Sequence, residues 1–277
     1  MKRIVPFALL LAALLASMGL KLGNDALPRK RVSGSSIIYI PSGPYLKPAT
    51  FGFSSLAADI IFLWAIQYYG NPEIPDKFAY FTHIFSIIFE LDPRYIDPYE
   101  VGALIAIYDR NDTPLALKIL DMGAAKNPDM WIFPFEAGHY ALARKDFDTA
   151  KDYFAKAMKI PDAPAVTQRL YANAAFKTMD YQTAWETWKS VYDTAADEQI
   201  RKIASNHLYQ VKAAVDLAAL KNAVFEFRAR AGRNPEGLQS LVRAGLIREI
   251  PRDFDDKDYV YDPQTGRVAS AGSPWKR

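Results

Sequence analysis

The sequence predicts a mainly α-helical protein: a solenoid of helical hairpins, followed by a small α+β module with a β-hairpin. The first observation is a period of 34 residues, kept by Ala116, Ala150 and Ala184. Such a period is typical of helix–turn–helix repeats, each of which buries its apolar face by stacking on the next. The second is a run without proline or glycine at residues 195–231, and the third is a proline–glycine turn between two β-rich runs near the C-terminus.

Composition narrows the class of function. The chain has 277 residues, half of them hydrophobic, and no cysteine, which excludes disulfides, cysteine-based zinc sites and a thiol nucleophile. Lys2, Arg3 and Lys21 are the only charges before Asp25, and the rest of the chain carries as many basic as acidic residues. A neutral body lacks the basic surface that nucleic acids require. We therefore expect no nucleic-acid partner.

Residues 1–22 are predicted to be a signal anchor. Residues 4–20 are almost entirely apolar and follow Lys2 and Arg3, and their length falls between a signal-peptide core and a membrane span. We expect an uncleaved helix in a bacterial inner membrane, with the positive end in the cytoplasm and the body on the periplasmic side. Cleavage near residues 17–19, which would release a periplasmic protein, is the second choice.

Residues 23–50 are predicted to be an extended tether. Pro41, Pro44 and Pro48, together with a serine–glycine run at residues 33–36, exclude a long helix. Residues 37–40 read Ile-Ile-Tyr-Ile and predict one short strand in this segment.

Residues 51–231 are predicted to form the helical solenoid, beginning with apolar helices at 56–69 and 78–91. Neither helix is long enough to span a bilayer, and Asp59 and the break at residues 70–72 argue further against it. We interpret them as a buried hairpin rather than a membrane-dipping element. Core packing also explains their aromatic residues better than a sugar-binding groove does, because these fall at helical spacing. They include Trp64, Tyr68, Tyr69, Phe78, Tyr80 and Phe81.

Three further pairs carry the repeat. Ala150, Phe154 and Ala157 lie at i, i+4 and i+7, hence on one helical face, where small residues allow close helix packing around an aromatic ring. Over about 100 residues, this alternation of small and large side chains resembles the tetratricopeptide repeat family. The resemblance implies a scaffold whose first helices line a concave groove that binds proteins or peptides.

Counting by 34 residues along the first helices gives the candidate partner-binding residues. Arg169 and Asn173 are expected to pair with a peptide's carboxylate or backbone, and Tyr108 and Phe135 to receive apolar side chains. The alternative is that the C-terminal module or residues 23–50 fill this groove. The candidates, in equivalent triples, are Val101, Phe135 and Arg169; Ile105, His139 and Asn173; and Tyr108, Leu142 and Phe176.

The C-terminal part begins with residues 195–231, predicted as one long helix or as a pair with a break near Asp216. Residues 232–277 are predicted to be a capping module: a Gly-Arg-Asn-Pro turn, a short helix, and a β-hairpin of residues 259–262 and 267–269. This order resembles the globular end of type II secretion pseudopilins over about 45 residues. The chain departs from them at residues 254–256 and lacks a prepilin cleavage motif, so it is not a pilin.

The sequence predicts no catalytic residue, cofactor or metal ligand. His83, His139 and His207 lack metal-site spacing, and no nucleophile elbow, phosphate-binding loop or dinucleotide fingerprint is present. The aspartates of residues 253–258 raise the question of calcium, but they lack the EF-hand pattern, and a solvated acidic turn is preferred.

The predicted function is therefore that of a non-enzymatic, membrane-anchored periplasmic scaffold that binds protein partners for assembly of an envelope complex, in secretion, pilus or electron-transfer systems. The alternative is a periplasmic enzyme or carbohydrate-binding protein that uses the aromatic helices. A third interpretation is a subunit embedded in one membrane complex, in which the hairpin of residues 56–91 is exposed rather than buried.

Overall fold

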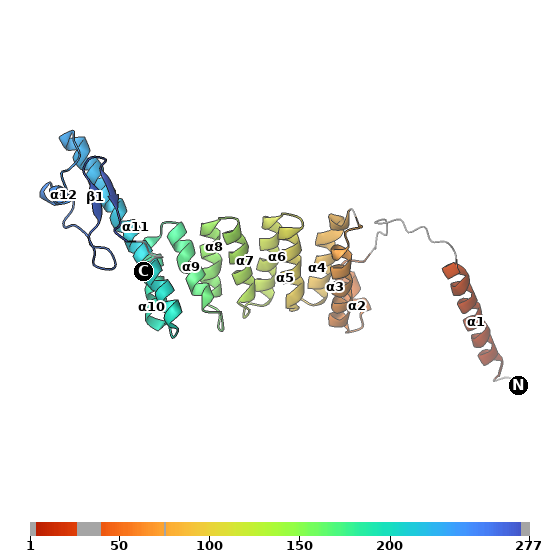
Figure 1. Ribbon diagram of the computed structural model, residues 1–277. Helices are drawn as coiled ribbons and strands as arrows, with labels where there is room; N and C mark the ends of the chain where they lie inside the picture. The colour runs from red at the N-terminus through yellow and green to blue at the C-terminus, as the bar shows by residue number, and fades with distance from the viewer. Residues whose placement is uncertain (1–3, 27–39, 75, 273–277) are drawn as a thin grey trace. The chain divides into compact units, whose positions relative to one another are not determined.

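The computed structural model of the protein describes residues 4–26, 40–74 and 76–272; in the first of these ranges it describes the side chains of residues 10–23. The chain is mainly helical and carries a small antiparallel sheet near its C-terminus (Figure 1). It divides into two compact units, Met1–Leu91 and Asp92–Arg277. The division falls inside the region predicted as one solenoid.

The first unit is helical. Its elements are α1 (Ile4–Ala26), α2 (Gly43–Ala49), α3 (Ser54–Gly70), a 3₁₀ turn η1 (Lys77–Tyr80) and α4 (Phe81–Leu91). The helices predicted at residues 56–69 and 78–91 are thus confirmed as α3 and as η1 with α4. Within the described residues, the chain contains no helix with both the length and the apolar character needed to cross a membrane.

The tether prediction is wrong for residues 43–49, which form α2. Pro44 lies in the first turn of this helix, where a missing N–H loses no helical hydrogen bond. α2 packs on α4: Gly43 is buried with no room for a Cβ beside Glu90, and Lys47 Nζ donates to the Glu90 carbonyl at 3.4 Å. Of the strand predicted at residues 37–40, residues 37–39 lie outside the described residues.

The hairpin of α3 and α4 is buried on one side of α3. Tyr69 lies at its centre, with its ring 5.4 Å from Phe81 and 5.8 Å from Phe85. The prediction of a buried hairpin holds for α4 and for this inner face. It is wrong for the outer face of α3, where three apolar side chains are 56–59% exposed: Leu56, Ile60 and Leu63.

The second unit is a succession of helices in which each packs on the next from α5 to α11 (Figure 1). Its helices are α5 (Ile96–Tyr108), α6 (Thr113–Lys126), α7 (Ile132–Ala143), α8 (Phe147–Ala157), α9 (Val166–Lys177), α10 (Tyr181–Thr194), α11 (Glu198–Ala231) and α12 (Gln239–Arg243). The repeat alanines Ala116, Ala150 and Ala184 are fully buried at the contacts between paired helices. Their spacing thus marks buried positions of α6, α8 and α10.

An aspartate caps the second helix of each pair. Asp112, Asp146 and Asp180 stand 34 residues apart, and the side chain of each accepts a hydrogen bond from the backbone N–H three residues later. The residue before each aspartate has a left-handed backbone, with φ between 53° and 61°: Asn111, Lys145 and Met179. These turns are a second repeat signal that the alanine spacing does not reveal.

Removal of one cap should have a measurable cost. We expect Asp146→Ala to lower the free energy of unfolding by about 1 kcal/mol, because the N–H of Thr149 loses its acceptor. Urea unfolding followed by circular dichroism measures the change. Asp152→Ala, at an exposed position on the same helix, is the control and should change stability by less than about 0.5 kcal/mol. Equal effects of the two substitutions would contradict the capping role.

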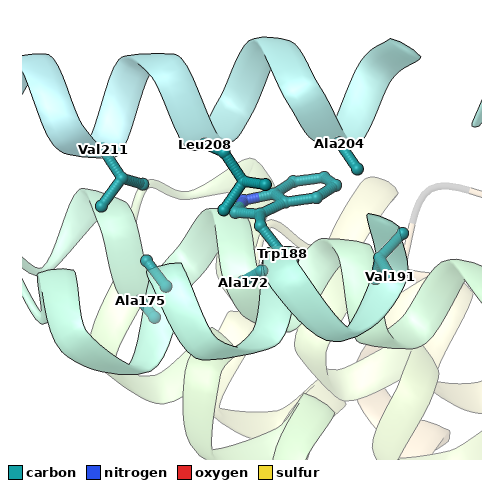
Figure 2. Close-up of a cluster of buried hydrophobic side chains, with 8 residues drawn as sticks. Ala172, Ala175, Trp188, Val191, Ala204, Leu208 and Val211 are labelled. Atoms are coloured by element: carbon teal, nitrogen blue, oxygen red, sulfur yellow. The ribbon is translucent and has the colours of Figure 1, made fainter. Parts of the chain in front are cut away.

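α11 is one uninterrupted helix of 34 residues, as predicted, and ends at Gly232 with φ of 70°. Its N-terminal part covers Trp188 of α10, together with Ala172 and Ala175 of α9 (Figure 2). The predicted hairpin is confirmed: β1 (Val260–Asp262) pairs antiparallel with β2 (Arg267–Ala269). The C-terminal part of α11 packs on this module through Leu220 and Val224.

Candidate functional site

The candidate partner-binding face belongs to the first helix of each pair, and the first pair is out of register with the count of 34. After α7, the N–H of Asp146 donates to the carbonyl of Ala141, five residues back, and the bond after α9 has the same span. After α5, the N–H of Asp112 donates to Ala106, six residues back. The α5–α6 turn is therefore one residue longer, and equivalent positions on α5 and α7 are 35 residues apart.

This insertion corrects the equivalence predicted for α5. Ile105 is 8% exposed and belongs to the core, as does its true equivalent Tyr140 at 6%, whereas Leu104 is 48% exposed. The predicted Val101, Ile105 and Tyr108 are replaced as equivalents of Phe135, His139 and Leu142 by Glu100, Leu104 and Ile107. We call the corrected set the first-helix face: Glu100, Leu104, Ile107, Phe135, His139, Leu142, Arg169, Asn173 and Phe176.

The aromatic residues of this face are supported by the core beneath them. The rings of Phe135 and His139 lie 4.6 Å apart, and both pack on the fully buried Phe154 of α8, at 6.2 and 5.6 Å. Phe176 is supported in the same way by Tyr181, at 5.7 Å. These rings are half-buried, so their orientation is fixed while part of each remains accessible.

The α9 end of the face carries polar groups without internal partners. Arg169 and Asn173 lie one helical turn apart and are half-buried. Within the part of the chain that the structure describes, neither side chain forms a hydrogen bond or an ion pair. A half-buried guanidinium beside an amide is suited to binding a carboxylate or a peptide carbonyl.

The α5 and α7 end is acidic. Burial raises the pKa of Glu100, and the nearby carboxylates of Glu136 and Asp97 raise it further. Tyr140 lies between the helices: burial raises its pKa, as do the charge of Glu136 and the hydrogen bond to it, and its ring meets Tyr108 edge-on at 6.3 Å. Two carboxylates that disfavour each other's charge favour a cationic ligand.

Glu100, Glu136 and Tyr140 were missed because counting by 34 residues places Val101, not Glu100, opposite Phe135. The signal that would have found them is the triplet of aspartate caps. Asp112 is preceded by the turn residues Asp109, Arg110 and Asn111, whereas shorter turns precede Asp146 and Asp180.

Two hollows lie elsewhere in the second unit. One of about 490 Å³ lies between α10 and α11, and an ion pair of Lys212 Nζ with Asp216 at 2.8 Å lies on its wall beside Trp185. A larger one of about 730 Å³ lies in the C-terminal module beside Tyr259 and Arg252. Neither contains a residue of the first-helix face.

The histidines and the acidic loop have structural partners. His83 Nε2 lies 2.9 Å from the Ile40 carbonyl, His139 packs on Phe154, and His207 stacks on Trp188 at 4.0 Å, where burial lowers its pKa. In the described residues, no group of three or more histidine, aspartate or glutamate side chains is arranged to hold a metal ion.

In the acidic loop, Asp253 is 4% exposed and accepts hydrogen bonds from the Tyr209 hydroxyl at 3.0 Å and from the N–H groups of Asp255 and Lys257, each at 2.9 Å. Burial raises the pKa of this carboxyl, but the hydrogen bonds outweigh that effect and hold it below its usual range. The predicted solvated turn is thus wrong for Asp253, which organises the loop, whereas Asp256 and Asp258 are exposed and pair with Arg252.

The comparisons with known proteins add no identity to this geometry. No protein-family model matches the chain, and no curated protein matches it.

Proposed function

We propose that the protein is a non-enzymatic scaffold: a solenoid resembling tetratricopeptide repeats, anchored in a bacterial inner membrane, whose first-helix face binds protein partners on the periplasmic side. The observation that supports it best is that α5–α10 form three successive helix pairs with the same turn and the same buried alanine. A solenoid of this kind leaves the first helices available for ligands.

The proposed anchor is α1. The described side chains Leu10, Leu14, Leu15 and Met18 are apolar and each more than half exposed, so they require an apolar environment. The side chains of residues 4–9 lie outside the described ones, and for them the proposal depends on the apolar sequence and on Lys2 and Arg3 before it.

The proposed link to an envelope complex rests on the C-terminal module. A long helix that ends at Gly232, the short helix α12 and the hairpin of β1 and β2 follow the order seen in pseudopilin globular ends. This supports secretion, pilus or electron-transfer assembly as the process that the scaffold serves.

The partner would be an extended segment of opposite polarity to the face. A lysine or arginine of the segment fits Glu100 and Glu136, an apolar side chain fits beside Phe135 and Leu104, and a carboxylate fits Arg169. Charged groups in complementary order give both specificity and register.

A charge-reversal variant tests the face. We expect Arg169→Glu with Asn173→Ala to lower the recovery of co-purified proteins from membranes by at least about tenfold, because a desolvated carboxylate would lose both donors and meet a like charge. The measurement is affinity purification of the full-length protein with quantitative mass spectrometry.

The matched control is Lys118→Glu with Asp152→Ala, which makes the same kinds of change at exposed positions of α6 and α8. It should leave recovery unchanged. Unchanged recovery with the Arg169 and Asn173 variant as well would remove the α9 end of the face from the proposed site.

A further inference from the structure

The outer face of α3 is an apolar surface without a cover in the described residues. Leu56, Ile60 and Leu63 follow one another at four and three residues, hence on one side of the helix, and Phe53 at its start continues the line. Their exposed fractions are 56%, 59%, 59% and 68%. We call these four residues the outer stripe.

The composition around the stripe matches lipid better than protein. None of its four side chains carries a hydrogen-bonding group, and Asp59 is the one charged residue in the sequence of α3. Trp64 and Tyr68 stack on each other at 4.9 Å along the same helix, and Tyr45 of α2 is 79% exposed. Protein interfaces surround their apolar centre with a polar rim, whereas an apolar face bordered by tryptophan and tyrosine is typical of helices at the membrane–water boundary.

The chain also keeps α3 close to the proposed anchor. Residues 27–39 connect α1 to the segment that begins at Ile40, and at about 3.5 Å per residue they cannot separate the two by more than about 50 Å. With α1 in a bilayer, the outer stripe therefore meets lipid at a high effective concentration, so even weak intrinsic affinity leads to contact.

We infer that α3 lies on the lipid surface, parallel to it, with Leu56, Ile60 and Leu63 inserted at the boundary between headgroups and acyl chains. This inference deepens the proposed function and rests on its anchor. α4 packs on the opposite face of α3 and so faces away from the lipid.

The absence of cysteine from the sequence makes the test direct, because one introduced cysteine gives a unique site for a polarity-sensitive fluorophore. The full chain is labelled at Leu63→Cys on the stripe, at Thr82→Cys on an exposed position of α4, or at Leu14→Cys in α1. Each protein is reconstituted in phosphatidylcholine–phosphatidylglycerol vesicles with and without brominated acyl chains.

We expect about twofold quenching by brominated lipid at Leu63→Cys, because an interfacial helix buries its apolar face among the first acyl carbons. Thr82→Cys should keep nearly all of its fluorescence, since α4 is farther from the lipid by about 10 Å, the spacing of packed helices. Ile60→Asp in the Leu63→Cys protein should abolish the quenching, and circular dichroism should show the same helix content because Ile60 is exposed.

The three labels separate the two ideas. Quenching at Leu14→Cys without quenching at Leu63→Cys overturns the inference and leaves the anchor in place. Quenching at Leu63→Cys without quenching at Leu14→Cys supports the stripe and overturns the anchor. A blue-shifted but unquenched label at Leu63→Cys means that a second copy or another protein covers the stripe, which also overturns the inference.

Discussion

Phe154→Ala is expected to lower the free energy of unfolding by about 3–5 kcal/mol, the cost of emptying a fully buried aromatic site. The ring packs between α7 and α8, and a Cβ placed on Gly138 would meet it at 2.6 Å, so the surrounding backbone is already as close as it can come. The loss should spread to neighbouring helices, because stacked repeats depend on their interfaces. Urea unfolding gives the size of the effect, and hydrogen exchange gives its extent.

The same substitution should weaken partner binding, because Phe135 and His139 rest on Phe154. Gly138→Ala provides the complementary test: alone it is expected to cost about 1–3 kcal/mol by overpacking, and combined with Phe154→Leu it should cost less than the sum of the two. A strictly additive pair, or a Phe154→Ala effect below about 1 kcal/mol, would contradict the packing described here.

Asp253→Ala is expected to cost about 2–3 kcal/mol, because it leaves buried donors of the C-terminal module without an acceptor. Hydrogen exchange in residues 250–270 should rise by the matching factor. Asp258→Ala is the control in the same loop: its carboxylate is exposed, 3.8 Å from Arg252, and it should have little effect. Similar exchange in both variants would show that Asp253 does not organise the loop.

The pH dependence of this effect has a definite sign. The pKa of Asp253 is lowered in the folded state, so its contribution to stability is present above the unfolded value of about 4 and is lost as pH falls through the folded value. Below pH 4 the wild-type module should therefore lose protection, while Asp253→Asn, which has no charge to lose, should change less. A parallel decline of both would assign the acid sensitivity to other groups.

Much of the fold follows from local sequence. The buried alanines predicted the second helices because Ala116, Ala150 and Ala184 lie after the variable turn, where the period of 34 residues is kept. α11 was predictable because residues 195–231 contain no helix breaker, and the hairpin because its turn ends at Gly266, which has φ of 71°.

The candidate site was less predictable because it depends on one inserted residue. Asp109, Arg110 and Asn111 have ordinary turn composition, so nothing local marks the longer turn, and its effect falls on α5. α2 was missed because its prolines were interpreted as helix breakers, although Pro44 lies in the first turn. The burial of Asp253 depends on Tyr209, a residue 44 positions away, which no local pattern connects to it.

α11 belongs to two cores at once: Leu208 and Val211 pack beneath Trp188, and Leu220 and Val224 pack beneath the hairpin module (Figure 2). A truncation after residue 231 would therefore leave a long amphipathic rod with half of its apolar side bare, prone to self-association. Fragments intended for crystallisation or for two-hybrid screening should either keep the chain through residue 272 or stop before Glu198. A load applied to the module would also be carried along this rod into the last repeat pair rather than absorbed at a hinge.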